Sequence, residues 1–225
     1  MSYGVTLALD GSTYEGSVAV LRDSIVLAER ALEASATPGR GGRDELFLPM
    51  VAECLAEAGA QVTGLDRIVC GGGPGSFTSL RIAASIAKGL AVGAGCPLFA
   101  VSSLLLIVAR DSVKPGRYLA ILPAMRGESF AALFEVGASG IIELAPPALV
   151  ADSDLPAEAR RLDAILTGPA ADGRTPHARG VATVLPFLVA AGECDVQTWE
   201  PTYGRLAEAQ VKWEQAHGRP LTAAG

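Results

Sequence analysis

The sequence predicts an α/β protein built as two lobes, and three observations support that prediction. An almost wholly apolar, β-rich segment at 3–10 is typical of a strand that is buried on both faces. A second apolar run, 65–69, stops at three consecutive glycines and is followed by a helical pattern. The opening strand–strand–strand pattern recurs, less clearly, after the turn at 114–116. We therefore expect a lobe at 1–113 and a smaller lobe at 114–225.

Composition and charge restrict the class of protein. The 225 residues suffice for one large or two small domains with a substantial core. Half of them are hydrophobic, but no apolar run approaches membrane-spanning length, and no basic and apolar leader precedes the first strand. The net charge of −6 argues against a free-standing nucleic-acid binder. The four cysteines form no C-x-x-C pair. We expect a cytoplasmic protein that does not contact a membrane.

The end of the first predicted strand allows two interpretations. The strand closes with Asp10-Gly11-Ser12-Thr13, and a hairpin with strands at 17–21 and 24–28 follows. A strand that ends in this way and returns as a hairpin resembles the first phosphate loop of the actin-like ATPase superfold. That resemblance implies that the loop contacts phosphate and that Asp10 holds a metal ion through water. In the alternative, Asp10 and Ser12 only order a turn through hydrogen bonds between side chain and backbone.

A helix is predicted on each side of the 65–69 strand. The first runs from a cap at Asp44 to about Ala58 and has an apolar stripe that includes Phe47, Val51 and Leu55. The second follows the glycines and reaches about Gly93. One face of this second helix carries large apolar side chains, at Ile82, Ile86 and Leu90. Another face carries only small ones, at Ala84, Ala87 and Ala91. The small face suits close approach by a partner helix, or equally packing against the chain's own sheet.

The glycine-rich turn at 71–76 could serve a ligand or only the backbone. Glycines let the chain pass close to another surface, and a helix N-terminus behind them offers unpaired N–H groups to an anion or a carboxylate. The P-loop pattern does not fit, because Ser76 follows Gly75 where that loop needs lysine. The dinucleotide fingerprint lacks its third glycine. Spacing alone favours a tight strand-to-helix turn over a ligand site.

The second half of the chain repeats the first in a reduced form. After a strand at 97–101 and a helix behind Ser102-Ser103, three strands are predicted at 118–122, 129–135 and 140–144. A short helix opening at Asp154 and a strand at 164–167 follow. A duplicated strand–strand–strand–helix unit is what the actin-like superfold requires. We therefore predict that superfold (ASKHA, ribonuclease-H-like), with two lobes of which the second is reduced.

The glycine turn taken together with the helix behind it is a more specific signal. Gly73-Pro74-Gly75-Ser76-Phe77-Thr78, with Leu80-Arg81-Ile82 behind it, resembles the signature of the bacterial TsaB (YeaZ) family. The resemblance extends over most of the chain, at 3–13, 44–110 and 118–134 and at Pro201-Thr202-Tyr203. Members of that family are non-catalytic partners of TsaD in making threonylcarbamoyladenosine on tRNA.

The resemblance implies a scaffold that binds and activates a TsaD-like catalytic subunit, with a TsaE-like ATPase as a third component. tRNA would be contacted only through the complex, and the chain itself would need no cofactor or metal. The family uses the two helices described above to pair with TsaD. The implied partner-contact residues are Phe47, Val51, Leu55, Gly73, Pro74, Gly75, Ser76, Phe77, Thr78, Arg81, Ala84, Ala87 and Ala91. The implied remnant of a nucleotide loop is Asp10, Gly11, Ser12 and Thr13.

This sequence departs from the family pattern at four places. Arg43-Asp44-Glu45 stands where members often have His-Ser-Glu, and Ser79 stands where they usually have glycine. Pro123 replaces the aspartate that precedes Ala124, and Gly204 replaces a leucine near the C-terminus. Because an actin-like ATPase needs an acid in its second lobe for metal and water, Pro123 counts against ATPase activity.

Two enzymatic alternatives are retained beside the scaffold. The first is a small actin-like ATPase or kinase that uses Asp10 and the glycine turn. The second is an M22-like peptidase, and the lack of metal ligands argues against it. His177 and His217 are the only histidines, they form no H-x-x-x-H pair, and we expect both on the surface. The sequence leaves open whether ATP or ADP lies at the partner interface and whether the chain alone forms a homodimer.

Overall fold

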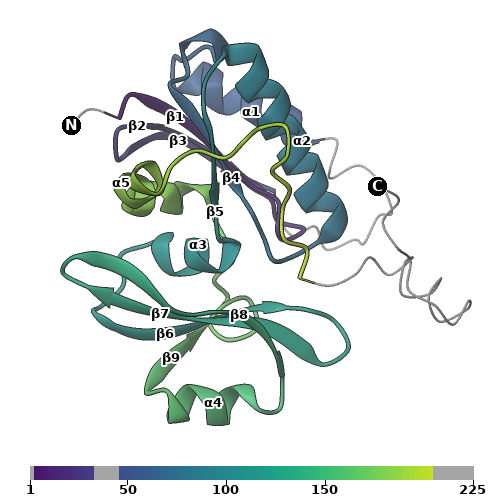
Figure 1. The fold of residues 1–225 in the computed structure, drawn as a ribbon, viewed down its shortest axis with the longest axis vertical. Helices are drawn as coiled ribbons and strands as arrows, with labels where there is room; N and C mark the ends of the chain where they lie inside the picture. Colours follow the sequence, from purple (N-terminus) through teal and green to yellow (C-terminus); the bar gives the residue numbers. More distant parts are fainter. Residues whose placement is uncertain (1–2, 33–45, 205–225) are drawn as a thin grey trace, which may run out of the picture.

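Two β-sheets lie one above the other, with a short helix between them (Figure 1). The structure, a computed structural model, describes residues 3–32 and 46–204. The expectations for Asp44 and for His217 lie outside these residues. Within them, the order of strands and helices agrees with the predicted duplicated unit.

The first sheet has five strands in the order β3-β2-β1-β4-β5. Their bounds are β1 (Val5–Asp10), β2 (Ser17–Arg22), β3 (Ile25–Ala31), β4 (Arg67–Gly71) and β5 (Leu98–Val101). β1 pairs antiparallel with β2 and parallel with β4, so it lies in the middle of the sheet. This position explains its apolar sequence, since Leu7 and Ala8 are fully buried from opposite sides of the strand. The predictions of a buried first strand and a following hairpin are confirmed.

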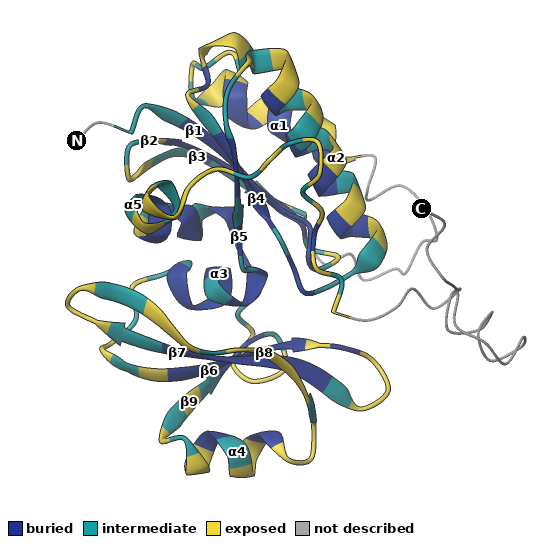
Figure 2. Cartoon of the chain, viewed as in Figure 1, coloured by how far each residue is buried: buried dark blue, intermediate teal, exposed yellow. Residues whose placement is uncertain are grey.

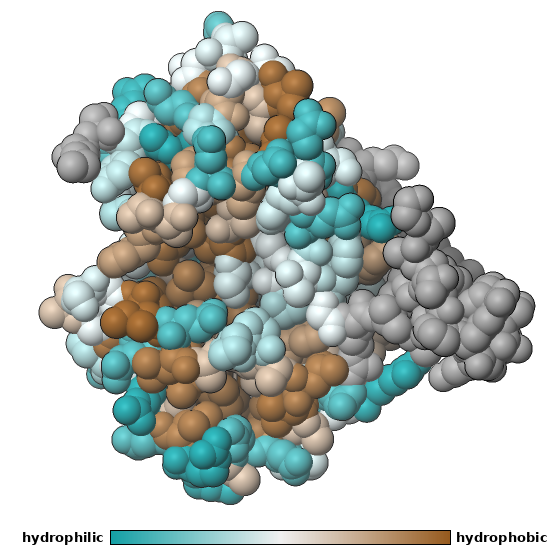
Figure 3. Space-filling view, in the orientation of Figure 1, coloured by the Kyte–Doolittle hydropathy of each residue, from teal (hydrophilic) through white to brown (hydrophobic). Residues whose placement is uncertain are grey.

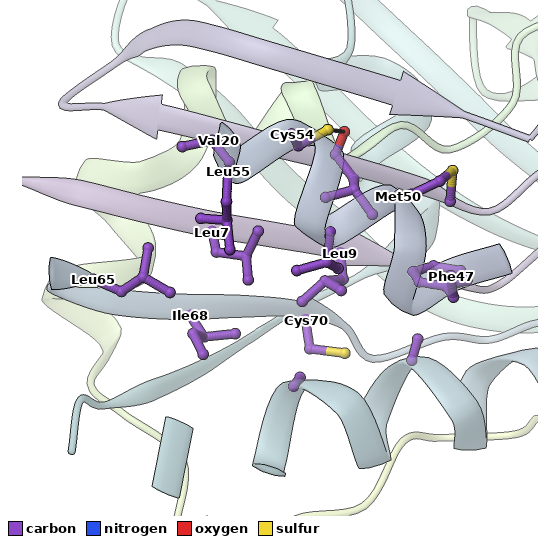
Figure 4. Packing of buried hydrophobic residues seen from close by; sticks show 14 of the residues in the cluster. Leu7, Leu9, Val20, Phe47, Met50, Cys54, Leu55, Leu65, Ile68 and Cys70 are labelled. Carbon is purple, nitrogen blue, oxygen red and sulfur yellow. Dashed lines mark hydrogen bonds between the residues drawn. The ribbon is translucent and has the colours of Figure 1, made fainter. Parts of the chain in front are cut away.

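One face of the first sheet is covered by α1 (Phe47–Glu57) and α2 (Phe77–Ala94). α1 lies over β2 and β3, and α2 lies over β4 and β1. Figure 4 shows the core that results, with Leu7 and Leu9 of β1 and Cys70 of β4 between the two helices. Burial raises the pKa of the Cys54 thiol in α1 to about 11, so this cysteine behaves as an apolar core residue.

The second sheet repeats the same topology with one strand fewer. Its strands are β6 (Gly116–Pro123), β7 (Glu128–Gly137), β8 (Gly140–Ala151) and β9 (Ala164–Thr167), in the order β8-β7-β6-β9. This is the order of β3-β2-β1-β4 in the first sheet, without a counterpart of β5. α4 (Leu155–Arg161) covers one face of this sheet, and α3 (Ser103–Ala109) covers the other.

The edge strand β8 is longer and more apolar on its surface than the sequence suggested. Ile142, Leu144 and Leu149 are each at least 44% exposed, and apolar surface is visible over this lobe in Figure 3. Pro146 and Pro147 lie in the middle of the strand, where its pairing with β7 shifts register. Since proline cannot donate a hydrogen bond to another strand, the pair protects this edge against continuous strand pairing.

The predicted assignment of all of 114–225 to the second lobe is wrong. The chain crosses back after β9, and α5 (Val181–Ala191) packs on the face of the first sheet opposite α1 and α2, in contact with α3 (Figures 1 and 2). No helix or strand is predicted from the sequence in this region. Pro186 lies inside the helix, where proline removes a backbone donor and argues against helix.

His177 opens this returning segment and is buried, so the expectation of a surface histidine is wrong. Its side chain is 7% exposed, and its Nδ1 accepts a hydrogen bond from the Arg179 N–H at 3.1 Å. The neighbouring Ala178 N–H donates to Ser17 Oγ of β2 at 2.9 Å. Burial lowers the pKa of His177 to about 4. The imidazole is therefore neutral at pH 7 and caps the short 3-10 turn that follows it.

We predict that acid destabilises the fold through His177. Its pKa is about 4 in the folded chain and 6.5 ordinarily. As the pH falls below about 6.5, this histidine therefore gains a proton in the unfolded chain before it does so in the folded chain, which favours unfolding. Between pH 7.5 and 5 the free energy of unfolding should fall by up to about 2 kcal/mol from this group. His177→Asn keeps an acceptor for the Arg179 N–H but does not titrate. Chemical denaturation of both proteins across this pH range measures the effect, and parallel profiles would contradict it.

Candidate functional site

A buried carboxylate lies where β1 ends. Asp10 is 1% exposed. Its Oδ1 accepts hydrogen bonds from Ser12 N–H at 3.0 Å and from Ser12 Oγ at 2.6 Å. Its Oδ2 accepts from Ser103 Oγ, at the start of α3, at 2.7 Å. The side chain therefore joins the end of the first strand to the helix that lies between the two sheets.

The glycine turn is fastened to the same group of residues. Gly73 N–H donates to Ser103 Oγ at 3.1 Å, and Ser103 N–H donates back to the Gly73 carbonyl at 3.0 Å. At the start of α2, Ser76 N–H donates to the Ser12 carbonyl at 2.7 Å. A Cβ on Gly71 would overlap the Asp10 carboxylate, and one on Gly75 would overlap Ser12. The glycines are therefore required for close packing of the chain on itself.

These contacts decide what Asp10 can do chemically. Burial raises its pKa above the ordinary 3.8, and hydrogen bonds from Ser12 and Ser103 act against that rise. Both carboxylate oxygens accept hydrogen bonds from the chain itself, so holding a metal ion through water would require these bonds to break. The geometry favours the alternative in which Asp10 and Ser12 order a turn. The nucleotide-loop assignment of Asp10 to Thr13 stays a prediction.

A segment at the end of the described chain, residues 201–204, lies against the glycine turn, and we call it the strap. Thr202 N–H donates to the Gly72 carbonyl at 2.8 Å. A Cβ on Gly73 would overlap the Thr202 carbonyl. Gly204 has a φ of +70°, and a Cβ there would meet the ring of Phe130 in β7. This explains the departure from the family pattern, because a leucine at 204 would require Phe130 and Pro74 to move.

Arg81 connects the strap to α2. Its guanidinium carbon lies 4.4 Å from the centroid of the Phe77 ring and 5.6 Å from that of the Tyr203 ring. The two rings are 4.5 Å apart. Arg81 Nε–H also donates to Tyr203 Oη at 3.2 Å. The Pro-Thr-Tyr motif therefore packs on the first turns of α2.

The small face of α2 points inward, which corrects the expected partner contact. Ala84, Ala87 and Ala91 are at most 5% exposed and belong to the core under the helix. Small side chains there let α2 lie close to the sheet. The α1 stripe has the same orientation, with Phe47, Val51 and Leu55 buried. As partner contacts these six residues were wrongly predicted, because their side chains are occupied by the chain's own core.

The exposed side of the two helices is composed of other residues. We call it the outer face, and its members are Leu48, Ala52, Ala56, Thr78, Arg81, Ser85, Gly89 and Val92. Leu48 is 54% and Val92 is 67% exposed. A Cβ on Gly89 would meet nothing within 4 Å. Most of this face could not be predicted from side-chain size alone; the polar residues at 78, 81 and 85, at helical spacing, were the available signal.

The predicted loop residues divide between core and surface. Gly73 and Pro74 are buried, Gly75, Ser76 and Phe77 are half-buried, and Thr78 is exposed. Of the predicted partner residues, Thr78 and Arg81 thus lie on the outer face. In the part of the chain that the structure describes, no three His, Cys, Asp or Glu side chains lie close enough together to hold a metal ion. Nor is any helix of that part long and apolar enough to cross a membrane.

Comparisons with known proteins identify the family to which this chain belongs. The family model described as "TsaD: tRNA N6-adenosine threonylcarbamoyltransferase" matches residues 43–159. The protein named TsaB of Escherichia coli (strain K12) is 36% identical over 137 residues, which cover 60% of this chain and 57% of that protein. TsaB of Bacillus subtilis (strain 168) is 28% identical over 226 residues, which cover 92% of this chain and 96% of that protein. The chain belongs to the TsaB (YeaZ) family.

The structural comparison supports the same family and its fold. The solved structure of YeaZ from Pseudomonas aeruginosa superimposes with a TM-score of 0.72 at 25% identity, covering 89% of this chain and 99% of that one. Together with the duplicated strand order, this confirms the predicted α/β actin-like (ASKHA) superfold. The TsaB resemblance drawn from the glycine turn and its helix is confirmed as well.

We predict that Asp10→Asn becomes relatively more stable as the pH rises. With a raised folded pKa, Asp10 keeps its proton to a higher pH in the folded than in the unfolded chain. The wild type should therefore lose stability from about pH 3.8 upward, through the folded pKa, whereas asparagine does not titrate. Denaturation of both proteins between pH 4 and pH 8 measures the difference. A wild type that gains stability relative to the variant over this range would contradict the assignment.

We predict that Ala87→Arg unfolds the first lobe. Ala87 is fully buried, and a buried charge without a partner costs several kcal/mol. Ser85→Arg, two residues away on the exposed side, should change the free energy of unfolding by no more than about 0.5 kcal/mol. Thermal melting of the two variants gives the comparison, and an Ala87→Arg protein that melts like the wild type would refute the inward orientation of this face.

Proposed function

We propose that this protein takes part in the biosynthesis of threonylcarbamoyladenosine on tRNA, as a non-catalytic scaffold for a TsaD-like catalytic subunit. The relatives from Escherichia coli and Bacillus subtilis are each named "tRNA threonylcarbamoyladenosine biosynthesis protein TsaB", which supports a role in this pathway. The match to the TsaD family model supports a partner of similar fold, since two chains with related helices can pair along them. The chain would bind and activate the partner, and the partner would contact tRNA.

The outer face is the observation that carries this proposal. It contains two exposed apolar side chains, Leu48 and Val92, and two exposed positions with a small side chain or none, Ser85 and Gly89. A glycine in the interior of an exposed helix destabilises that helix by about 1 kcal/mol relative to alanine. The absence of a side chain at Gly89 has no benefit for this chain's own packing, because nothing lies within 4 Å. It does allow a partner helix to approach closely.

The ATPase alternative has weaker support. It depends on Asp10 and the glycine turn, whose polar groups are engaged with Ser12, Ser103 and the strap. β6 ends at Pro123, where an acid would be needed. We propose no nucleotide site in this chain alone. A simple check is the activity of Asp10→Asn in a reconstituted tRNA-modifying system, which the scaffold proposal expects to be nearly intact; a hundredfold loss with unchanged melting would favour the ATPase.

The decisive experiment is binding of the TsaD-like protein from the same organism. We predict that Gly89→Arg abolishes the association, because a long charged side chain would be buried in the contact, and several kcal/mol removes a micromolar affinity. The variant should melt no lower than the wild type, since arginine is a better helix former than glycine. Calorimetric titration and thermal melting of each protein provide the two measurements.

Ala157→Arg is the matched control, because it places the same side chain on an exposed position of α4 in the second lobe. It should bind as the wild type does. Formation of threonylcarbamoyladenosine by the TsaD-like subunit should depend on the wild type and on this control, and be lost with Gly89→Arg. Wild-type binding by Gly89→Arg would remove the outer face as the contact, and failure of the wild type to bind would refute the scaffold proposal itself.

A further inference from the structure

Arg81 is exposed, yet its position is fixed. Its guanidinium packs against the Phe77 and Tyr203 rings, which also contact each other, and it donates through Nε to Tyr203 Oη. Tyr203 is in turn held by the strap, whose Thr202 N–H is bonded to the glycine turn. An exposed arginine usually loses side-chain entropy when it binds a partner. Here much of that ordering is already complete in the free chain.

This cation has no acidic partner within the described residues. The ion pairs formed there by arginine involve Arg30, Arg110, Arg117, Arg161, Arg174 and Arg179. α2 has no acidic residue in its first turn either. In a chain of net charge −6, Arg81 is therefore a fixed positive charge that its own surroundings do not neutralise. Its terminal amino groups are available for a planar, bidentate contact.

Arg81 also lies on the same side of α2 as the small residues of the outer face, Ser85 and Gly89. Arg81, Ser85 and Gly89 are four residues apart in turn, so they follow one side of α2. A partner backbone that approaches at Ser85 and Gly89 would pass within reach of the guanidinium one turn away. Its carboxylate side chains would then meet an oriented fork of N–H donors.

We propose that Arg81 anchors an aspartate or glutamate of the protein partner and that Tyr203 is the residue that positions it. The inference rests on the proposed function and adds the chemistry of the contact. A carboxylate matches the guanidinium fork in shape and charge, which lysine cannot reproduce. An RNA phosphate is the less favoured ligand, because backbone recognition uses clusters of basic residues and this chain is acidic.

The test is titration of the TsaD-like subunit with Arg81→Met in the absence of RNA, at low and at high salt. The affinity should fall about tenfold to a hundredfold, as for a charge-assisted hydrogen bond. The wild type should weaken with salt more steeply than the variant does. Arg81→Lys should recover only a small part of the loss. Arg160→Met in α4 changes the net charge equally and should bind as the wild type does.

Tyr203→Phe tests the positioning role, since it keeps the ring but removes the hydroxyl that Arg81 Nε contacts. We expect it to weaken binding several-fold in the wild-type background and to have no further effect in Arg81→Met. Independent losses in the two backgrounds would show that Tyr203 acts by itself and would overturn the positioning part of the proposal.

Three other outcomes would overturn the carboxylate anchor. Arg81→Met could bind as tightly as the wild type. It could bind weakly but melt at a lower temperature with unchanged salt dependence, which is a structural effect. Its loss could arise only when tRNA is added, which identifies phosphate as the ligand. If the wild type itself does not bind, the scaffold proposal fails first, and this is seen before any variant is measured.

Discussion

The hydrogen bonds to the buried Asp10 carboxylate join the end of the first strand to the helix between the two sheets, which begins 93 positions later in the chain. One oxygen closes the turn after β1 through Ser12, and the other bonds Ser103 at the start of α3. Because α3 supplies Leu104 and Ile107 to the second-lobe core and Leu106 to the first, this contact also fixes how the two sheets face each other. A buried carboxylate is unfavourable without such donors, which is why the three hydrogen bonds are all present.

The same contact determines where α2 begins and therefore which side of it is exposed. Ser103 bonds Gly73 in both directions, and Ser12 accepts from Ser76, the residue before the helix. A helix whose start is fixed has its rotation fixed as well, since each residue advances it by a constant angle. The alanines are thus held against the sheet, and Gly89 is held toward solvent. The packing of the turn therefore determines which residues of α2 belong to the outer face.

The sheets could be predicted from the sequence because their signals are local. Apolar runs that end in turn residues, and hairpins between them, identify β1 to β4, β6, β7 and β9 within a few residues, and they identify the start of β8 but not its end. The return of the chain to the first lobe could not be predicted in this way. Pro186 obscured α5, and the segment that buries His177 is held by the Ala178 N–H bond to Ser17 on β2, 161 positions earlier in the chain. The orientation of α2 was also missed, because alanine suits a close helix–sheet contact as well as a close helix–helix contact.

The strap, α3 and the turn after β1 all supply hydrogen-bond partners to the strand–glycine–helix turn. Backbone N–H and C=O groups in such a turn need partners, and a bound phosphate is one way to supply them. Here the partners come from the chain: Thr202 donates to Gly72, Ser103 exchanges bonds with Gly73, and Ser76 donates to Ser12. Gly204 then passes between Pro74 and Phe130, so the strap contacts both lobes at the position where they meet. With these polar groups bonded within the chain, the turn forms a fixed base for the start of α2.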